Sequence, residues 1–327
     1  MVSISTPVER APGPSRARVF LRRLRSGDEA AHLITLIFAA SILLITALIV
    51  YELYVNSSLS RQKFGWDFLW TRTWDPVFEH FGALTFLFGT IVTSTVALLL
   101  AIPLGIGAAI FLSELSPHRI SDPLTFLIEL LAAVPSVIYG LLGVFILVPI
   151  MRTDVMPFLN ATLGFLPFFQ GPMYGVGLLT ASVVLAIMIV PFIISVSREV
   201  LLAVPAQQRQ AALALGATRW ESTIKVVVPY ARKGIVGSIF LALARALGET
   251  MAVTMVIGND PRITSSLFAP GYSIAAVIAN EFTEATSDLY IHALVELGLV
   301  LFVLTIIING VARLLILATT RKMVAPA

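Results

Sequence analysis

Six long runs of apolar residues, each almost free of charge, constrain this sequence more than any other feature. A helix needs about 20 residues to cross the ~30 Å hydrocarbon layer of a bilayer, and each run reaches roughly that length. Because 57% of the residues are hydrophobic and only 13% are charged, the chain is too apolar for an ordinary soluble domain. We therefore predict an all-α membrane protein with six transmembrane helices. The predicted spans are 32–53, 81–115, 124–151, 175–197, 235–257 and 289–318.

The basic residues between the predicted spans indicate how the chain is oriented. If the N-terminus is cytoplasmic, sixteen Lys and Arg residues fall on the inner side and five on the outer side, with Arg245 left inside a span. Inner loops of membrane proteins carry the excess of basic residues, so both termini are predicted to be cytoplasmic. Residues 1–30 are polar and Arg-rich and are predicted to form a disordered tail, 31–320 the membrane domain and 321–327 a short C-terminal tail.

The first outer loop carries aromatic residues at nearly every second position, within KFGWDFLWTRTWDPVFEH. Aromatic rings of this kind favour the depth of the lipid headgroups, so an interfacial belt is the simpler interpretation. A ledge on which an external partner docks is the alternative. The residues concerned are Phe64, Trp66, Phe68, Trp70 and Trp74.

The fifth predicted span contains a cation and an anion four residues apart, Arg245 and Glu249, within LALARALGETMAVTMVIG. A charge at the centre of a membrane helix costs about 2.5–3.5 kcal/mol on insertion scales, so something must offset it. The spacing places both groups on one face of a helix, where each can partly neutralise the other. They can form an ion pair that only holds the bundle together, although aliphatic packing would do the same at lower cost. The alternative, which we favour, is that they line the path of a charged solute.

The longest inner connection, SREVLLAVPAQQRQAALALGATRWESTIKVVVPYARKG, has the pattern of two helices rather than of a shapeless linker. We predict a helix over 206–215, a left-handed turn at Gly216, and a capping box formed by Thr218 and Glu221. Pro229 is predicted to end the second helix, and Arg209, Arg219 and Lys225 are predicted to be exposed. Small residues at 211, 212 and 214 allow close docking of a soluble partner, while an amphipathic helix resting on the headgroups is the alternative.

The residues of this connection resemble a known motif. Gln210-Ala211-Ala212, then Gly216, then Val226-x-Val228-Pro229 match the spacing EAA-x3-G-x9-I-x-L-P of the permease subunits of bacterial ATP-binding-cassette (ABC) importers, with Gln210 in place of the usual Glu. The resemblance implies the type I ABC-importer permease fold. It also implies that 205–229 is a coupling segment seated in a cleft on an ATPase, with Gln210, Ala211, Ala212, Gly216 and Pro229 as its coupling residues.

Three further segments narrow the resemblance, namely FGALTFLFGTIVTS, LLAAVPSVIYGLLG and ARALGETMAVTMVIGN. They are similar to the PstC-type membrane subunits of phosphate-specific ABC importers, and the similarity runs from about Trp70 to the C-terminus. This resemblance implies a multi-pass protein of the bacterial inner membrane that translocates inorganic phosphate into the cytoplasm. The implied partners are a second, PstA-type permease, two PstB-type ATPases that bind ATP and Mg, and a PstS-type phosphate-binding protein outside the membrane.

Within this interpretation the guanidinium fork of Arg245 holds two phosphate oxygens, and Glu249 holds Arg245 when the path is empty. Weaker candidates for a polar route are Glu129, Ser136 and Tyr139. A permease for another oxyanion, such as sulfate or molybdate, remains open because an Arg–Glu pair does not distinguish tetrahedral anions. An ion-coupled secondary transporter is the rival from another class, but it would need no docking segment.

Several kinds of chemistry are excluded by what the sequence lacks. The chain has no cysteine, and its histidines, at 32, 80, 118 and 292, show no metal-binding spacing. It has no G-x4-G-K-[ST] motif, so it does not bind ATP through a P-loop. We therefore predict that this chain is not an enzyme and binds no cofactor itself, and that its energy comes from another chain.

Overall fold

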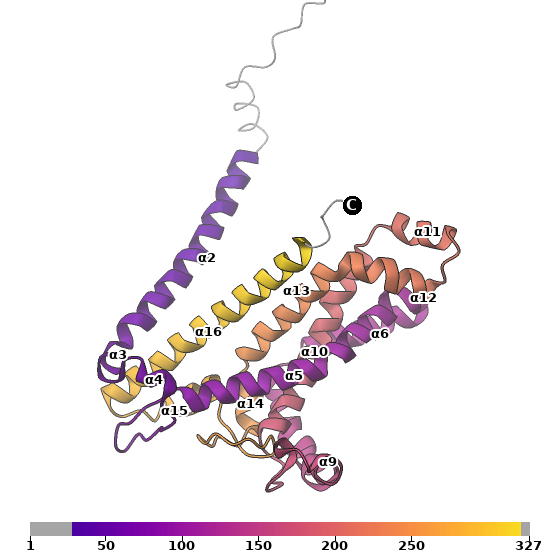
Figure 1. The fold of residues 1–327 in the computed structure, drawn as a ribbon. Coiled ribbons are helices and arrows are strands. Elements are labelled where there is room, and N and C mark those ends of the chain that lie inside the picture. Colours follow the sequence, from indigo (N-terminus) through magenta and orange to yellow (C-terminus); the bar gives the residue numbers. More distant parts are fainter. Residues whose placement is uncertain (1–27, 322–327) are drawn as a thin grey trace, which may run out of the picture. The chain divides into compact units, whose positions relative to one another are not determined.

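The computed structural model describes residues 28–321, and all of its regular structure is helical within that range (Figure 1). It divides into two units, Met1–Val55 and Asn56–Ala327, each of which is described by itself. The tails predicted at 1–30 and 321–327 lie outside the described residues, apart from 28–30 and 321.

Most helices follow one another closely along the chain, with longer connections at 71–83 and 257–273. The α-helices are α2 (Asp28–Asn56), α3 (Ser58–Phe64), α4 (Asp67–Trp70), α5 (Leu84–Ile110), α6 (His118–Ala132), α7 (Ser136–Leu142), α8 (Val148–Ile150), α9 (Met156–Leu163), α10 (Leu178–Leu202), α11 (Ala206–Ala214), α12 (Arg219–Ser222), α13 (Val228–Leu247), α14 (Met251–Val256), α15 (Ile274–Glu281) and α16 (Asp288–Arg321). The π-helical turns are η1 (Phe111–Leu115), η2 (Gly143–Leu147), η3 (Met151–Val155) and η5 (Thr223–Val227), and η4 (Pro167–Phe169) is a 3-10 turn.

Six helical segments of the described residues are long and apolar enough to cross a membrane, which confirms the predicted helical class and number of spans. The first of them lies in α2, which belongs almost entirely to the first unit. The segments are Ala31–Asn56, Leu84–Leu115, Ser136–Leu163, Leu178–Leu202, Arg219–Leu247 and Asp288–Val311.

The third and fifth spans differ from the predicted ones. The apolar run predicted as one helix over 124–151 is divided, because α6 ends at Ala132 and α7 begins at Ser136. Pro135 causes the division, since it lacks an N–H donor and disfavours helical geometry at the residue before it. The fifth span begins earlier than predicted, at Arg219, and its helix breaks between Leu247 and Met251.

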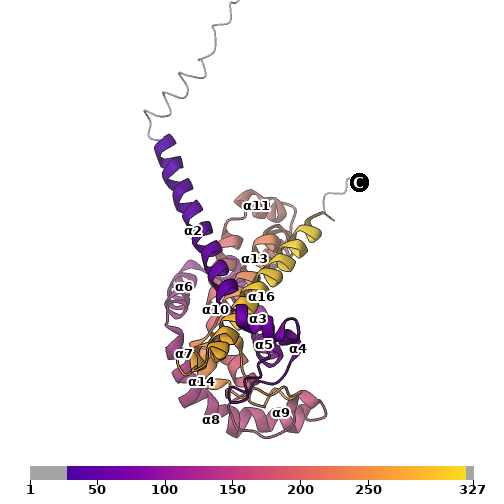
Figure 2. The ribbon, with the colours of Figure 1, turned by 90° about the vertical axis from the view of Figure 1, so that its left-hand side faces the viewer.

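Helix α10 is the central helix of the second unit (Figure 2). Two thirds of its apolar window (67%) is buried, against 28% or less in the other spans. Leu185, Ile189 and Ile193 of α10 are fully buried against α5 and α13. Alanines on those two helices, including Ala101 and Ala242, permit the close approach that membrane helices need where water supplies no driving force.

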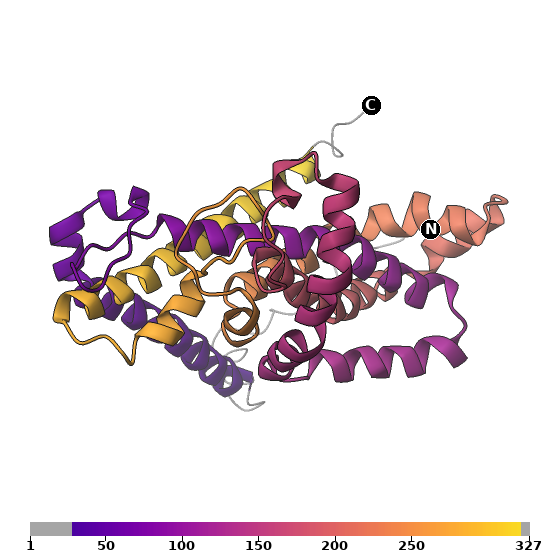
Figure 3. The ribbon, with the colours of Figure 1, turned by 90° about the horizontal axis from the view of Figure 1, so that it is seen from below.

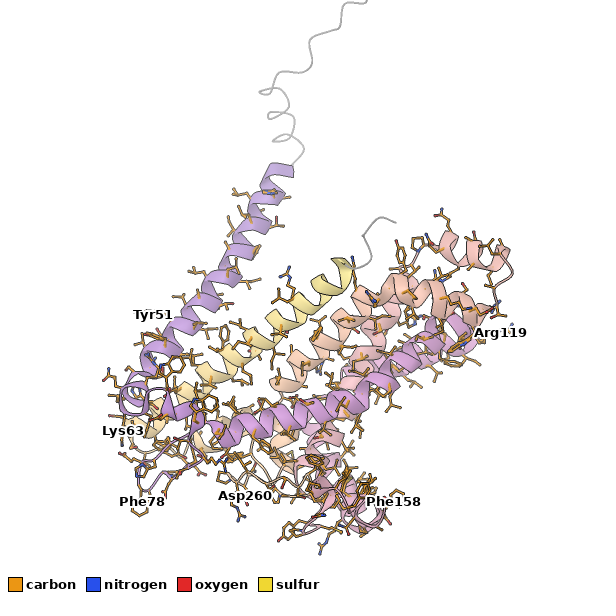
Figure 4. The ribbon with its side chains drawn as sticks, viewed as in Figure 1. Tyr51, Lys63, Phe78, Arg119, Phe158 and Asp260 are labelled. Atoms are coloured by element: carbon orange, nitrogen blue, oxygen red, sulfur yellow. The ribbon has the colours of Figure 1, made fainter. Side chains whose placement is uncertain are left out.

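The second unit has two distinct ends. Helix α11 lies at one end and α9 at the opposite end in both Figure 1 and Figure 2. Figure 4 places Arg119 at the α11 end, and Phe78, Phe158 and Asp260 at the other. Figure 3 looks onto the α9 end, where the segment from α7 to α9 lies apart from the lobe formed by α3, α4 and α15. The predicted inner connection and the predicted outer loops therefore lie at opposite ends.

Aromatic side chains form the core of the lobe at α3, α4 and α15. The ring of Trp74 lies 4.8 Å from that of Phe81, and its Nε1 donates a hydrogen bond to Glu281 Oε2 at 2.7 Å. Phe68 is fully buried, whereas Trp66 and Trp70 are 82% and 73% exposed. Only these two of the five loop aromatics are therefore free for a belt or a docking ledge, because Phe64, Phe68 and Trp74 fill the core.

The short apolar segment 271–277 is buried throughout. Helix α15 contacts α5 and α16, and its Ile274 N–H donates to Thr90 Oγ1 at 3.0 Å. A Cβ at Gly89 would lie 2.1 Å from the Tyr272 carbonyl oxygen, so only glycine allows this approach. The short apolar run is thus an internal part of the bundle.

Truncation of Phe81 to alanine should destabilise the lobe strongly. Phe81 is 1% exposed and contacts three aromatic rings, so Phe81→Ala is expected to cost about 3–5 kcal/mol. Phe78→Ala is the matched control, because Phe78 is 73% exposed and its loss should change stability by less than about 0.5 kcal/mol. Thermal unfolding of the purified protein in detergent measures both. Equal midpoints for the two variants would contradict the assigned core.

Candidate functional site

The fifth span is interrupted at the position of the predicted charged pair. Helix α13 ends at Leu247, α14 begins at Met251, and Glu249 falls in the break between them. The Glu249 carboxylate accepts a hydrogen bond from the Ala252 N–H at 3.2 Å and so caps the first turn of α14. Glycine at 248 and β-branched Thr250 both disfavour a continuing helix, and they are the only sequence signal of the break.

Helix α7 packs tightly against the segment that follows the break. A Cβ at Gly140 would lie 2.5 Å from Met255 Sδ and 3.2 Å from Ala252 Cα. This close contact holds α14 in place after the chain has left α13. The break is therefore a supported feature of the fold, and discontinuous helices of this kind form the solute sites of many transporters.

Arg245 lies in the last turn of α13 and makes no ion pair with Glu249 among the described residues. The break directs the Glu249 carboxylate to α14. The two charges therefore do not lie on one helical face, contrary to the prediction. The Cζ atom of Arg245 lies 5.7 Å from the centroid of the Phe192 ring on α10, a cation–π distance. This contact offsets part of the cost of the charge but leaves its hydrogen-bond donors available.

The face of α13 that bears Arg245 is open in this subunit. Leu241, Arg245 and Gly248 are exposed, and Gly237 lies on the same stripe. A Cβ at Gly237 would meet no atom within 4 Å. The stripe is thus uncovered within residues 56–321, and its glycines leave room for another chain or for a solute.

The weaker polar candidates lie on α6 and α7. Tyr139 is buried within electrostatic reach of Arg245, but its hydroxyl donates to the Leu131 carbonyl at 2.7 Å and closes the turn between the two helices. Glu129 is exposed on α6, and Ser136 is half-buried at the start of α7. Among the described residues no hydrogen bond or ion pair joins these side chains to Arg245.

The inner connection over 205–229 is the second candidate site, and it forms the predicted helix, turn and cap. Helix α11 runs over Ala206–Ala214, and Gly216 has a left-handed φ of 86°. Thr218 Oγ1 accepts from the Glu221 N–H at 3.2 Å, while Glu221 Oε2 accepts from the Thr218 N–H at 3.0 Å. This reciprocal pair satisfies two donors at the start of α12, so the turn has a defined geometry.

The surface of this segment is largely uncovered. Of the predicted coupling residues, Gln210, Ala211, Gly216 and Pro229 are exposed and Ala212 is buried. Leu215 is 90% exposed beside them. A groove of about 480 Å³ is lined by Ala211, Ala212, Gly216, Glu221, Lys225 and Val226, among others.

Pro229 does not end the second helix, contrary to the prediction. The chain stays helical from Arg219 through the π-helical turn η5 and into α13, where Pro229 occupies the first turn. The wider π-helical turn η5 directly before it accommodates the proline, which lacks an N–H donor and would otherwise interrupt the helix. The exposed segment and the fifth span are therefore one continuous rod as far as Leu247.

Arg209 was predicted to be exposed. The structure shows instead that it is paired with Glu114. Its Nη2 lies 2.6 Å from Glu114 Oε1, and its Nε lies 2.9 Å from Glu114 Oε2. These hydrogen bonds raise the pKa of Arg209 above its usual value. The two residues are 95 positions apart, so no local pattern could have indicated the pair. Arg219 and Lys225 are exposed, as predicted.

No group of three or more metal-ligating side chains occurs among the described residues. Arg245 and Glu249 form one candidate site at the helix break, and the α11–α12 segment forms a second.

Removal of the Thr218 hydroxyl should loosen the turn before α12. Thr218→Ala is expected to lower the hydrogen-exchange protection of the Glu221 amide by about fivefold, because a lost N-cap costs about 1 kcal/mol. Thr218→Ser keeps the acceptor and serves as the control. Hydrogen exchange followed by mass spectrometry over 206–227 measures the effect, and unchanged protection in the alanine variant would refute the capping role.

Comparison with known proteins assigns the chain to a family. The profile of the family described as "Binding-protein-dependent transport system inner membrane component" matches residues 101–321. The phosphate transport system permease protein PstC of Mesorhizobium japonicum is 47% identical over 301 residues, which cover 91% of this chain and 92% of that protein. PstC of Xylella fastidiosa (strain Temecula1) is 46% identical over 322 residues, covering 97% and 96%.

A solved structure shows that the fold is shared as well. The crystal structure of a bacterial ABC transporter involved in the import of the acidic polysaccharide alginate covers 90% of this chain and 98% of the matched chain, with a TM-score of 0.52 and 16% identity. The family consists of multi-pass inner-membrane permeases and not of ATPases. The chain therefore belongs to the inner-membrane components of binding-protein-dependent transport systems, and within them to the PstC-type permeases.

Proposed function

We propose that this chain is the membrane-spanning subunit of an ATP-driven importer that moves inorganic phosphate into the cytoplasm. The names of its PstC relatives support the solute, and the open guanidinium of Arg245 at a helix break is the observation that carries the proposal. The chain has the type I ABC-importer fold, with both termini and α11 in the cytoplasm. Its partners are a PstA-type permease, two PstB-type ATPases that bind ATP and Mg, and a PstS-type binding protein.

The depth of Arg245 supports a role in the solute path. Arg245 follows Lys233, the last inner basic residue of α13, by twelve positions, which is about 18 Å of helix. A cation at that depth costs about 2.5–3.5 kcal/mol, and no carboxylate is paired with it among the described residues. A passing anion offsets this cost, and the planar fork of a guanidinium matches two oxygens of a phosphate.

Glu249 acts differently from the role that its spacing suggested. Its carboxylate caps α14 and so fixes the break, which sets where Arg245 points. It also places a negative charge close to the path, beyond the end of α13. Repulsion from this carboxylate favours release of the anion, because a site that binds too tightly would trap its solute.

The α11–α12 segment receives the movement of the ATPases. Closure of the ATPases on ATP displaces this segment through Gln210, Ala211, Ala212 and Gly216. The rod that contains Pro229 carries the displacement to the last turn of α13, where Arg245 lies. Opening to the two sides of the membrane then alternates by tilting of packed helices around the site. Gln210 has no charge, so it makes no ion pair with the ATPase.

Loss of the Arg245 guanidinium should strongly lower phosphate uptake without preventing assembly. Arg245→Gln removes a charged hydrogen-bond donor worth about 1.5–3 kcal/mol, so uptake of radiolabelled phosphate should fall by about 10- to 150-fold. Arg262→Gln is the matched control, since Arg262 is exposed and pairs with Asp260 at the opposite end from α11. Normal uptake by Arg245→Gln in cells that contain the assembled complex would overturn the assigned role.

Competition by other oxyanions distinguishes phosphate from the remaining solutes. A guanidinium fork also fits sulfate and molybdate, so the site by itself allows a permease for those ions. We expect that neither anion lowers the uptake of radiolabelled phosphate when added at the same concentration. Strong competition by sulfate or molybdate would favour a permease for that anion instead. The subunit alone in liposomes should transport nothing, whereas a secondary transporter would be active there.

A further inference from the structure

A partly buried ion pair connects α11 to the inner end of α5. Arg209 lies on α11, and Glu114 lies in the π-helical turn η1 that ends α5. Both carboxylate oxygens of Glu114 accept from the guanidinium, at 2.6 and 2.9 Å. The side chains are 23% and 7% exposed, so the pair is largely shielded from solvent. Two parallel bonds of this kind fix orientation as well as distance.

The same guanidinium also reaches the end of α10. Arg209 Nη1 donates to the Val204 carbonyl at 2.5 Å, and Nη2 donates to the Leu201 carbonyl at 2.7 Å. Carbonyls at a helix C-terminus lack partners within the helix, so an arginine there satisfies them. One side chain therefore joins three elements, namely α11, the end of α10 and the end of α5.

Apolar packing holds α11 only weakly. Ala212 is its single buried residue, and the side chains at 210, 211, 213 and 214 are exposed. Below Arg209 lies a compact apolar cluster that includes Leu112 of η1, Leu201 of α10 and Val227 of η5. The ends of the membrane helices are thus rigid with respect to one another, and the Arg209–Glu114 pair fastens α11 to them.

We propose that the Arg209–Glu114 pair is the strut through which displacement of α11 reaches α5 and α10. This inference rests on the proposed function. Arg209 and Glu114 are positioning residues, because neither touches the solute or the nucleotide. The path continues along α10, whose Phe192 ring lies under Arg245. When the strut is broken, α11 follows the ATPases but α5 and α10 do not, so ATP is hydrolysed without import.

A role in stability alone predicts a different result. Removal of one partner leaves a shielded charge uncompensated, which destabilises a protein. Were the pair only an anchor, its loss would lower the amount of folded complex, and import and ATP hydrolysis would fall in proportion. The number of phosphate ions imported per ATP hydrolysed separates the two roles, because this ratio does not depend on the amount of complex.

The test uses the complete importer in proteoliposomes, with the binding protein and ATP. Glu114→Gln and Arg209→Gln should lower the import-to-hydrolysis ratio by about 5- to 150-fold, the usual range of coupling between distant sites. Exchange of the two charges, Glu114→Arg with Arg209→Glu, should recover part of the loss. Asp122→Asn is the matched control, because this carboxylate on α6 is 67% exposed and lies 3.9 Å from its partner His118. A wild-type ratio in both single variants would overturn the strut.

A chemical cross-link supplies a second, independent readout. The chain has no cysteine, so Glu114→Cys with Arg209→Cys introduces its only two thiols. With free thiols the double variant should hydrolyse ATP without import, and a short bifunctional thiol reagent should restore the ratio. Failure of the linked protein to recover would contradict the strut, even if the single variants do not assemble. Absence of phosphate import by the wild-type complex in the same assay would instead count against the proposed function.

Discussion

The placement of a guanidinium within a membrane-spanning helix is the constraint around which the second unit is arranged. Arg245 lies in the last turn of α13, and its guanidinium lies over the ring of Phe192. An aromatic face compensates only part of the lost hydration. The remaining features leave the guanidinium available to an anion that binds only while it passes. The helix ends directly after Arg245, the stripe around it is open, and Glu249 is held at α14 and does not neutralise it.

The site and the exposed segment belong to one mechanical system because two routes connect them. The first is the continuous rod from Arg219 to Leu247, in which the π-helical turn η5 accommodates Pro229 without ending the helix. The second runs from α11 through Arg209 and Glu114 to the ends of α10 and α5. Both routes converge at Arg245, since α13 carries it and α10 supports it through Phe192. A bundle of this kind transmits small displacements because its packed core is not continuously deformable.

Hydropathy and local chemistry predicted the parts of the fold that short segments determine. The number of spans follows from apolar runs, and the cap at Thr218 and the turn at Gly216 follow from residue types at fixed spacing. Apolarity alone could not show that Pro135 divides one run, or that Gly248 and Thr250 break another. The Arg209–Glu114 pair was beyond prediction, because only the tertiary fold brings together residues 95 positions apart. Packing of Phe68 and Trp74 in the lobe was not predicted, because aromatic rings suit a protein core as well as a headgroup layer.

The central claim is that the face of α13 bearing Arg245 borders an aqueous path and not lipid. Leu241 lies one turn before Arg245 on that face, and the chain has no other thiol to interfere with a cysteine there. The direct measurement is the rate at which a charged, water-soluble thiol reagent modifies Leu241→Cys in the assembled importer, with Val303→Cys on α16 as an exposed comparison in a membrane span. The account predicts rapid modification at 241 that phosphate slows, and little at 303. Modification at 241 by lipid-soluble reagents only, unaffected by phosphate, would contradict it.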